Sequence, residues 1–322
     1  MSDTSAKSVR SRDFIIKWIF EISIVILIII LGITTKGFMS WKNISGIFRN
    51  MAQIGVLAYG ITFAISCGEI DLSVPSTVAL TGIVVGLCCN KLPIPVNAAV
   101  FVGIFVMLIF SVIIGLLNTL LTQKFKMPAF IATMAVMYVV YGFAAIISRG
   151  FPVIGFPAWY NFIGAGNILG VIPVPAVIMV AMFVLSYFMM NHTKFGRAVN
   201  AVGGNVEAAR LSGIQVLKVK TFTFIYVQLC ALLSGIMVSS QVMSANFNFG
   251  KTWDFQAISC VVIGGTSFMG GRGRIWGTFI GLFFYGIVTN AMTLLNVNQY
   301  GQYIVRGVLI TIAVIINLMR KD

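Results

Sequence analysis

The segment Gly68–Pro75, with the sequence GEIDLSVP, holds two carboxylates between two apolar stretches. The other acidic residues are dispersed, so Glu69 and Asp71 are the one pair whose spacing suits acid–base chemistry or the binding of an ion. A local alternative is that Asp71 or Ser73 caps a helix whose first turn accommodates Pro75. The residues leave both interpretations open.

Other catalytic arrangements have weaker support. The single histidine, His192, has no Ser or Cys neighbour in a triad-like pattern, and no group of His, Cys, Asp and Glu has metal-ligand spacing. Residues 245–252, ANFNFGKT, fit a relaxed phosphate-loop pattern, but a true phosphate loop follows a buried strand, whereas this one joins two apolar stretches. The sequence therefore predicts a chain that is not an enzyme, binds no metal and carries no cofactor of its own.

The composition explains why charged chemistry is scarce. Of the 322 residues, 59% are hydrophobic and only 9% are charged, and the mean hydropathy is +0.99. A soluble domain carries about 25% charged residues and could not bury so much apolar surface. The formal net charge of +14 could attract nucleic acid, but the Lys and Arg residues are scattered singly, as expected where they flank membrane spans. We therefore expect a membrane protein in contact with lipid and without a nucleic-acid partner.

Hydropathy predicts an all-α polytopic fold of about ten transmembrane helices, because a hydrocarbon core of about 30 Å needs about 20 apolar residues per helix. The predicted spans lie near residues 18–34, 46–66, 74–90, 97–121, 129–148, 173–190, 219–242, 255–268, 276–294 and 300–318. The eighth is short for a full crossing. Residues 1–17 would be a cytoplasmic tail and residues 18–322 the membrane domain, with both termini inside because Lys and Arg then gather on inner segments.

Glycine positions suggest two pseudo-repeated halves. At an offset of 195 residues, glycines at 55, 82 and 86 coincide with glycines at 250, 277 and 281. Internal repeats are typical of transporters. The last predicted span holds Arg306, which would either pair with a partner inside the bundle or extend outward to the membrane surface.

Two connections between predicted spans are long. Residues 149–172 are outside, carry one charge, and are expected to form an interfacial or re-entrant hairpin. Residues 191–218 are inside and polar, and within them a short helix near 206–210 would follow a turn at Gly203–Asn205 and end at Gly213. A stiff helix bracketed by glycines suits docking to a partner, while an ordinary amphipathic connector is the alternative.

Three blocks of sequence carry a family resemblance. They are GEIDLSVPSTVALTG (68–82), GRAVNAVGGNVEAARLSGI (196–214) and VVIGGTSFMGGRGRIWGTFIG (261–281). Together they resemble the permease subunits of carbohydrate importers of the ABC type, such as the ribose, xylose, arabinose, galactose and autoinducer-2 permeases. The similarity covers nearly the whole chain. The family usually has Gly where Glu69 and Pro75 stand here.

The resemblance implies a subunit of a homodimer or heterodimer in the bacterial cytoplasmic membrane. A cytoplasmic ABC ATPase would supply ATP and Mg²⁺ chemistry, and a periplasmic or lipoprotein sugar-binding protein would deliver a monosaccharide. The residues implied to couple the chain to the ATPase are Gly203, Gly204, Asn205, Glu207, Ala208, Ala209, Arg210, Ser212 and Gly213. The signature segment is implied to consist of Gly68, Glu69, Asp71, Ser73 and Pro75.

A pathway for a neutral, polyhydroxylated cargo needs hydroxyl, amide and aromatic groups. Candidates within the predicted spans are Asn118, Thr133, Tyr138, Gln241, Gln256 and Asn290, each of which could instead make an interhelical hydrogen bond. A nucleoside or a branched-chain amino acid is an alternative cargo. An ion-coupled secondary transporter is a second alternative, for which Glu69, Asp71 and Arg306 would be the working charges.

Overall fold

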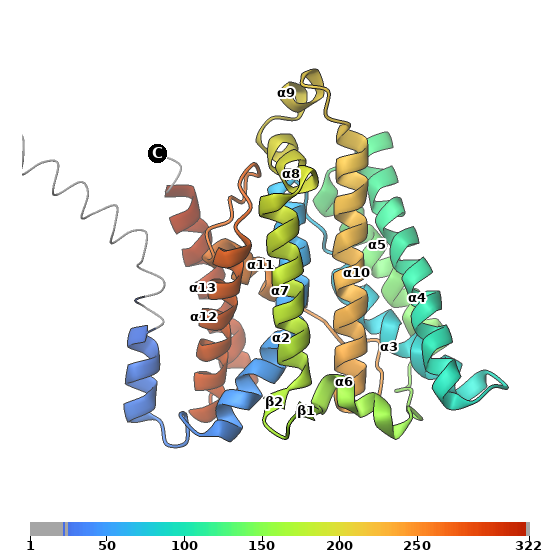
Figure 1. Cartoon of the computed structure of the whole chain (residues 1–322), viewed down its shortest axis with the longest axis vertical. Helices are drawn as coiled ribbons and strands as arrows, with labels where there is room; N and C mark the ends of the chain where they lie inside the picture. The colour runs from blue at the N-terminus through green and yellow to red at the C-terminus, as the bar shows by residue number, and fades with distance from the viewer. Residues whose placement is uncertain (1–21, 23–24, 320–322) are drawn as a thin grey trace, which may run out of the picture.

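The computed structural model describes residue 22 and residues 25–319, and this part of the chain is mostly helical (Figure 1). After a helical segment at Val25–Thr34, the elements in chain order are α2 (Trp41–Ser66), α3 (Val74–Lys91), α4 (Val96–Thr119), the π-helical turn η1 (Leu120–Lys124), α5 (Ala129–Ile147), the 3₁₀ turn η2 (Ala158–Tyr160), α6 (Asn161–Ala165), β1 (Asn167–Ile168), β2 (Ile172–Pro173), α7 (Val174–His192), α8 (Lys194–Gly204), α9 (Val206–Leu211), α10 (Val216–Val242), α11 (Trp253–Ile263), α12 (Ile275–Leu294) and α13 (Gln299–Met319).

Among the described residues, six helices are long and apolar enough to cross a membrane: α3, α4 with η1, α5, α7, α10 and α12. Each predicted span from the second onward coincides with a helix, and the described end of the first coincides with Val25–Thr34. The predicted eighth span is indeed short, since α11 has 11 residues. The tail at 1–17 and the start of the first span lie outside the described residues.

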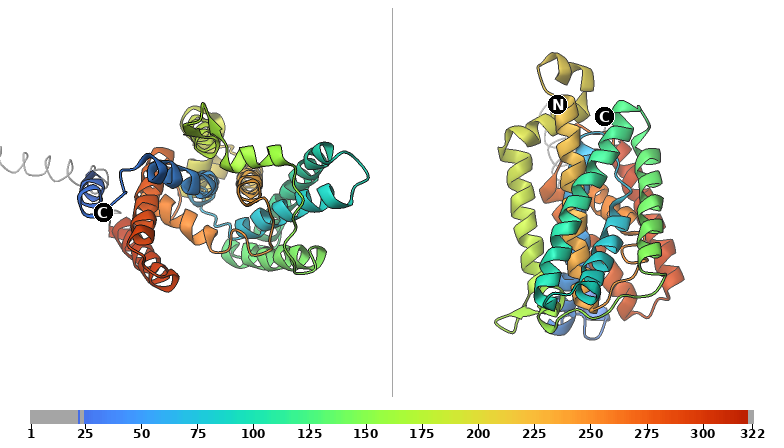
Figure 2. Two further views of the ribbon diagram at one scale, coloured as in Figure 1. Left: turned by 90° about the horizontal axis from the view of Figure 1, so that it is seen from below. Right: turned by 90° about the vertical axis from the view of Figure 1, so that its right-hand side faces the viewer.

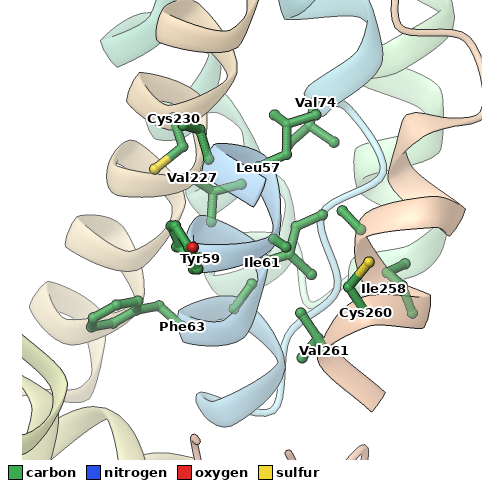
Figure 3. Packing of buried hydrophobic residues seen from close by; sticks show 14 of the residues in the cluster. Leu57, Tyr59, Ile61, Phe63, Val74, Val227, Cys230, Ile258, Cys260 and Val261 are labelled. Atoms are coloured by element: carbon green, nitrogen blue, oxygen red, sulfur yellow. The ribbon is translucent and has the colours of Figure 1, made fainter. Parts of the chain in front are cut away.

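Helix α2 runs through the middle of the bundle, between α7, α10, α11 and α12 (Figure 2). Every residue from Val56 to Ser66 is buried, and small residues such as Gly60 let neighbouring backbones approach closely. Figure 3 shows Leu57 and Ile61 of this helix packed among apolar side chains that include Val227 of α10 and Val261 of α11. The long helices are therefore held around one buried axis.

The two ends of the bundle differ. Helix α9 projects from one end, and β1, β2 and α6 lie at the other (Figure 1). The predicted hairpin at 149–172 forms η2, α6 and a two-stranded sheet in which Ile168 pairs with Ile172. It is tied to the end of α10, because Gly164 N–H donates to Ser240 Oγ at 2.7 Å and Asn161 Nδ2 donates to the Ser240 carbonyl oxygen at 3.1 Å. The segment thus covers this end of the bundle.

Two irregular segments precede helices. Residues 67–73 connect α2 to α3, and residues 243–252 connect α10 to α11. The ends of the two segments lie close together, because a Cβ on Gly250 would be 3.1 Å from the carbonyl oxygen of Pro75. With 11 residues, α11 is about 16 Å long, so it cannot cross the hydrocarbon core alone.

The glycine offset of 195 residues does not relate equivalent elements. It matches Gly55, inside α2, with Gly250, which lies in a turn with a φ of +75°. The structure therefore gives no support to a repeat in that register.

Candidate coupling surface and polar cavity

Helix α9 is built by a local cap. Asn205 is its N-cap, and its Oδ1 accepts a hydrogen bond from Ala208 N–H at 2.9 Å. After Ser212, Gly213 has a φ of +82°, a conformation that favours glycine and stops the helix. The sequence predicted both the cap and the stop, and α8 joins α9 directly before it.

Glu207 and Arg210 pair with each other on the exposed side of α9. Arg210 Nη2 is 2.5 Å from Glu207 Oε1 and Arg210 Nε donates to Oε2 at 3.1 Å. This contact holds the pKa of the Glu207 carboxyl below its usual value. Both side chains are about two-thirds exposed, and Leu211 beside them is 76% exposed. Ala209 is buried under the helix, so the exposed side of α9 is an apolar and charged surface on a fixed support.

Gly203 fixes α8 to the rest of the bundle through backbone contacts. A Cβ at this residue would collide with the Ser66 carbonyl oxygen at the end of α2, whereas one at Gly204 would find its nearest neighbour 3.7 Å away. The loop between α11 and α12 joins the same contact, because Gly271 N–H donates to that Ser66 oxygen at 2.9 Å. Asn200 Oδ1 accepts from Gly273 N–H at 2.9 Å. Helix α8 is therefore attached at once to α2 and to the α11–α12 loop.

Asp71 is buried and fully engaged in hydrogen bonds. Its Oδ1 accepts from the backbone N–H and the hydroxyl of Ser73, at 2.9 Å and 2.5 Å. Its Oδ2 accepts from Gln228 of α10 at 2.7 Å and from Asn118 of α4 at 3.2 Å. Thr77 completes the group by donating to Gln228 Oε1 at 2.6 Å. The carboxylate thus joins α3, α4 and α10, and Ser73 is the N-cap of α3.

Glu69 makes a buried ion pair. Its Oε1 is 2.6 Å from Lys220 Nζ, near the start of α10, and it also accepts from Gln123 Nε2 at 3.1 Å. The side chains of Glu69 and Lys220 are 7% and 11% exposed. The Glu69 carboxylate therefore has a lysine partner. Gly68 precedes it with a φ of +77°, and Pro75 lies in the first turn of α3 as the sequence predicted.

A polar cavity of about 360 Å³ lies between α2, α11, α12 and α13. Gln256 and Asn290, two of the predicted pathway residues, line it. Asn290 is engaged by a reciprocal pair of amide hydrogen bonds with Asn43, at 2.7 Å and 3.0 Å. The sequence analysis missed Trp253, Tyr285 and Tyr303, which also line the cavity. The sequence signal that could have indicated them is an aromatic residue next to a polar one, or one helical turn away from it.

The other predicted pathway residues lie apart from this cavity. Asn118 belongs to the Asp71 group, and Thr133 Oγ1 accepts from Leu72 N–H at 3.1 Å, so both hold the segment before α3. Tyr138 lines a second cavity, with Pro75 and Asp254, of about 360 Å³. Gln241 accepts a hydrogen bond from Gln53 and lines a separate cavity that contains Arg49. The six candidates are thus not one continuous site in this chain.

Arg306 lines the polar cavity from α13. It donates through Nη2 to Gln302 Oε1 at 3.3 Å, and its guanidinium lies 5.9 Å from the ring centre of Tyr303. The neighbouring residues that the structure describes provide no acidic partner for it. Both contacts are with residues of α13 itself, about one turn before Arg306.

Comparison with known proteins assigns the chain to a family. The model of the family described as "Branched-chain amino acid transport system / permease component" matches residues 43–314. Because this match covers most of the chain, the chain belongs to that family of permease components. Together with the long apolar helices, this makes it a multi-pass membrane protein.

Individual relatives cover almost the entire length. The ribose import permease protein RbsC of Bacillus subtilis strain 168 is 39% identical over 295 residues, which is 91% of this chain and 89% of the relative. RbsC of Escherichia coli K12 is 36% identical over 97% of this chain and 98% of its own length. The L-arabinose ABC transporter permease protein AraH of Azospirillum brasilense is 32% identical over 99% and 94%. No solved structure matches the chain.

Proposed function

We propose that this chain is the transmembrane permease subunit of an ABC importer that carries a monosaccharide such as ribose or arabinose. The observation that carries the proposal is the attachment of α8 and α9. The exposed α9 follows directly on α8, which Gly203 holds against both α2 and the α11–α12 loop, so the movement of a partner bound to α9 can reach two parts of the bundle at once. The partner would be a cytoplasmic ATPase that binds ATP and Mg²⁺, while this chain performs no hydrolysis.

The proposal extends to the coupling residues. Gly203, Gly204, Asn205, Gly213 and Ser212 would shape and support the surface. Ala209 would pack beneath it, and the exposed Ala208 would lie on the surface with Glu207 and Arg210, which would face the ATPase. The coupling loop spans 191–218.

The topology follows from the same proposal. About ten helices would cross the bacterial cytoplasmic membrane within residues 18–322, with the tail at 1–17, α9 and both termini on the cytoplasmic side. The two halves would be related by inversion, because α2 followed by 67–73 and α3 corresponds in form to α10 followed by 243–252 and α11. A second permease subunit, identical or different, would complete the pathway, and a periplasmic or lipoprotein sugar-binding protein would deliver the cargo.

Two alternatives are weighed by specific observations. The description of the family favours a branched-chain amino acid as the cargo, and a nucleoside is a further option. The relatives reported above, however, are named for ribose and arabinose. A secondary transporter would need a carboxylate free to bind an ion. Glu69 pairs with Lys220 and Asp71 accepts four hydrogen bonds, which argues against that role.

Co-purification tests the coupling assignment. The solubilised chain should retain an ATPase subunit identified by mass spectrometry, and replacing residues 205–212 by a Gly–Ser linker of equal length should abolish this. Replacing residues 167–172, which form the sheet at the opposite end, serves as the matched control and should leave the ATPase bound. Retention of the ATPase by the first variant would overturn the assignment.

Uptake into vesicles tests the cargo. ATP-dependent uptake of labelled D-ribose or L-arabinose should be competed by unlabelled monosaccharides and not by leucine or adenosine. Competition by leucine or adenosine alone would replace the proposed cargo with one of the two alternatives. Uptake that collapses with an uncoupler while ATP remains high would favour the secondary transporter.

A further inference from the structure

The polar cavity between α2, α11, α12 and α13 contains polar atoms that lack a partner within the described residues. Tyr285 of α12 is 3% exposed, and within the described residues its hydroxyl lies against the hydroxyl of Thr289 on the same helix and has no partner on another helix. Thr289 is one turn further along the same helix, and the buried Nε of Arg306 on the facing helix α13 makes no hydrogen bond with any residue that the structure describes. Buried polar groups without full hydrogen bonding destabilise a fold, so a ligand that pairs with them binds favourably.

The lining has two complementary parts. Aromatic rings come from Trp253, Tyr285 and Tyr303, and amides or cations come from Gln256 and Arg306. Rings pack against the C–H faces of a polyhydroxylated ring, while amides and a guanidinium hydrogen-bond with its hydroxyls. The volume of about 360 Å³ lies at the small end of ligand sites, which span about 300–1,000 Å³.

The position of α11 adds a third observation. Its first residues, Thr252 and Trp253, line the cavity, and the chain before them is irregular. Irregular backbone at membrane depth is tolerated where it is buried or lines a cavity, and the start of a helix within the membrane presents N–H groups to the oxygen atoms of a ligand. Thr252 itself has a φ of +71°, which is a strained value for a threonine.

From these observations we propose that the cavity is a binding site for one monosaccharide within a single subunit, with the Tyr285 hydroxyl and the Arg306 guanidinium hydrogen-bonded to sugar hydroxyls. The inference rests on the proposed function and adds a place where the cargo pauses inside this chain. Trp253 and Tyr303 supply the rings that pack against the sugar.

Direct binding tests the site. The permease with its ATPase, in lipid nanodiscs and without the binding protein, is titrated with D-ribose while saturation transfer from protein to the sugar protons is recorded by NMR. Wild type is expected to saturate ribose above the level of empty nanodiscs. Tyr285→Phe keeps the ring and removes only the hydroxyl, so the Kd should rise about 2- to 10-fold, and Arg306→Met should raise it more than 10-fold.

Three further variants separate binding from folding. Tyr300→Phe removes a hydroxyl from an exposed tyrosine of α13 that is not in the cavity lining, and Arg149→Gln removes an exposed arginine outside it. Both should keep the wild-type Kd within 2-fold. Arg306→Lys retains a cationic donor and should recover part of the affinity lost in Arg306→Met, which a general folding defect would not allow.

Ribose saturation equal in wild type, Tyr285→Phe and Arg306→Met, or absent in wild type, would overturn the site. The proposed function is judged separately by ATP-driven uptake with the binding protein present. If wild type imports ribose or arabinose while the cavity variants bind like wild type, the importer stands and the cavity is not the site. If neither sugar is imported but leucine or adenosine is, the proposed function itself fails.

Discussion

The polar groups in and around the two irregular segments of the chain differ in whether they have hydrogen-bond partners. Around residues 67–73, the two carboxylates each have hydrogen-bond donors or a cation in contact, drawn from α4 and α10. Around residues 243–252, polar atoms such as the Tyr141 hydroxyl and the Arg306 Nε have no hydrogen-bond partner within the described residues, and two cavities remain. Polar groups that already have partners hold helices together, whereas those without partners are available to a ligand.

The largest effect on stability should come from removing the cation that pairs with Glu69 of the first segment. Lys220→Met leaves the Glu69 carboxylate buried without its cation, and breaking a buried ion pair from one side costs about 3–5 kcal/mol. We expect a loss of unfolding free energy of this size, measured in mixed detergent micelles. Lys218→Met, an exposed lysine two residues earlier, is the control and should change little. Equal behaviour of the two variants would remove the distinction between the segments.

A comparison of two aspartates tests the same contrast, with a smaller expected loss of unfolding free energy. Asp71→Asn places an amide donor among the donors of Ser73, Asn118 and Gln228, and we expect a loss of about 1–3 kcal/mol. Asp254→Asn, in the first turn of α11, replaces a buried carboxylate that accepts only backbone N–H groups, so the loss should be smaller. Thermal unfolding of both variants in one detergent would check the order, and the reverse order would contradict it.

Two adjacent glycines refine the contrast further. In Gly203→Ala, the new methyl group meets the Ser66 carbonyl oxygen just before the first segment, so the backbones of α2 and α8 must separate. Overpacking of this kind costs about 1–3 kcal/mol. In Gly204→Ala, the nearest atom is 3.7 Å away, so stability and uptake should stay close to wild type. Gly203→Ala should lower uptake per molecule of permease in the membrane, and equal uptake by the two variants would show that this contact does not transmit movement.

The smallest effect on stability should come from the exposed pair of α9. Exchanging the charges, with Glu207→Arg and Arg210→Glu together, preserves a pair of opposite charges at the same spacing. We therefore expect unchanged unfolding, but lost uptake and lost ATPase binding, because the pattern of charge presented to the partner is reversed. Normal uptake by this double variant would show that the pair only braces the helix. If the double variant also loses stability, the exposed pair contributes to folding as the buried pair of Glu69 and Lys220 does.

Hydropathy was enough to predict the helices and even the short length of α11, because these depend on local composition. The cap at Asn205 and the stop at Gly213 were also predictable, since they involve neighbouring residues. The pairing of Glu69 with Lys220 was not, because these residues are far apart in sequence and meet only when α10 packs beside 67–73. For the same reason Asn118 suggested a pathway but belongs to the Asp71 group.

The site was less predictable than the fold. Amides such as Gln256 were predicted because they are polar within an apolar span. Tyr285 resembles an ordinary core aromatic in the sequence, and only the fold places it in the lining of the polar cavity. The two pseudo-repeated halves remain a prediction, because the glycine offset pairs Gly55 inside a helix with Gly250 in a turn.

Helix α4 together with η1 has a consequence for the lipid around the protein. Its 29 residues, Val96–Lys124, measure about 43 Å, well above the hydrocarbon thickness of about 30 Å. Phe101, Phe105 and Ile113 are exposed along it. Hydrophobic mismatch therefore makes α4 tilt in a thin bilayer. Because Asn118 of this helix donates to Asp71, we expect the tilt of α4, and with it the thickness of the bilayer, to bear on the segment before α3.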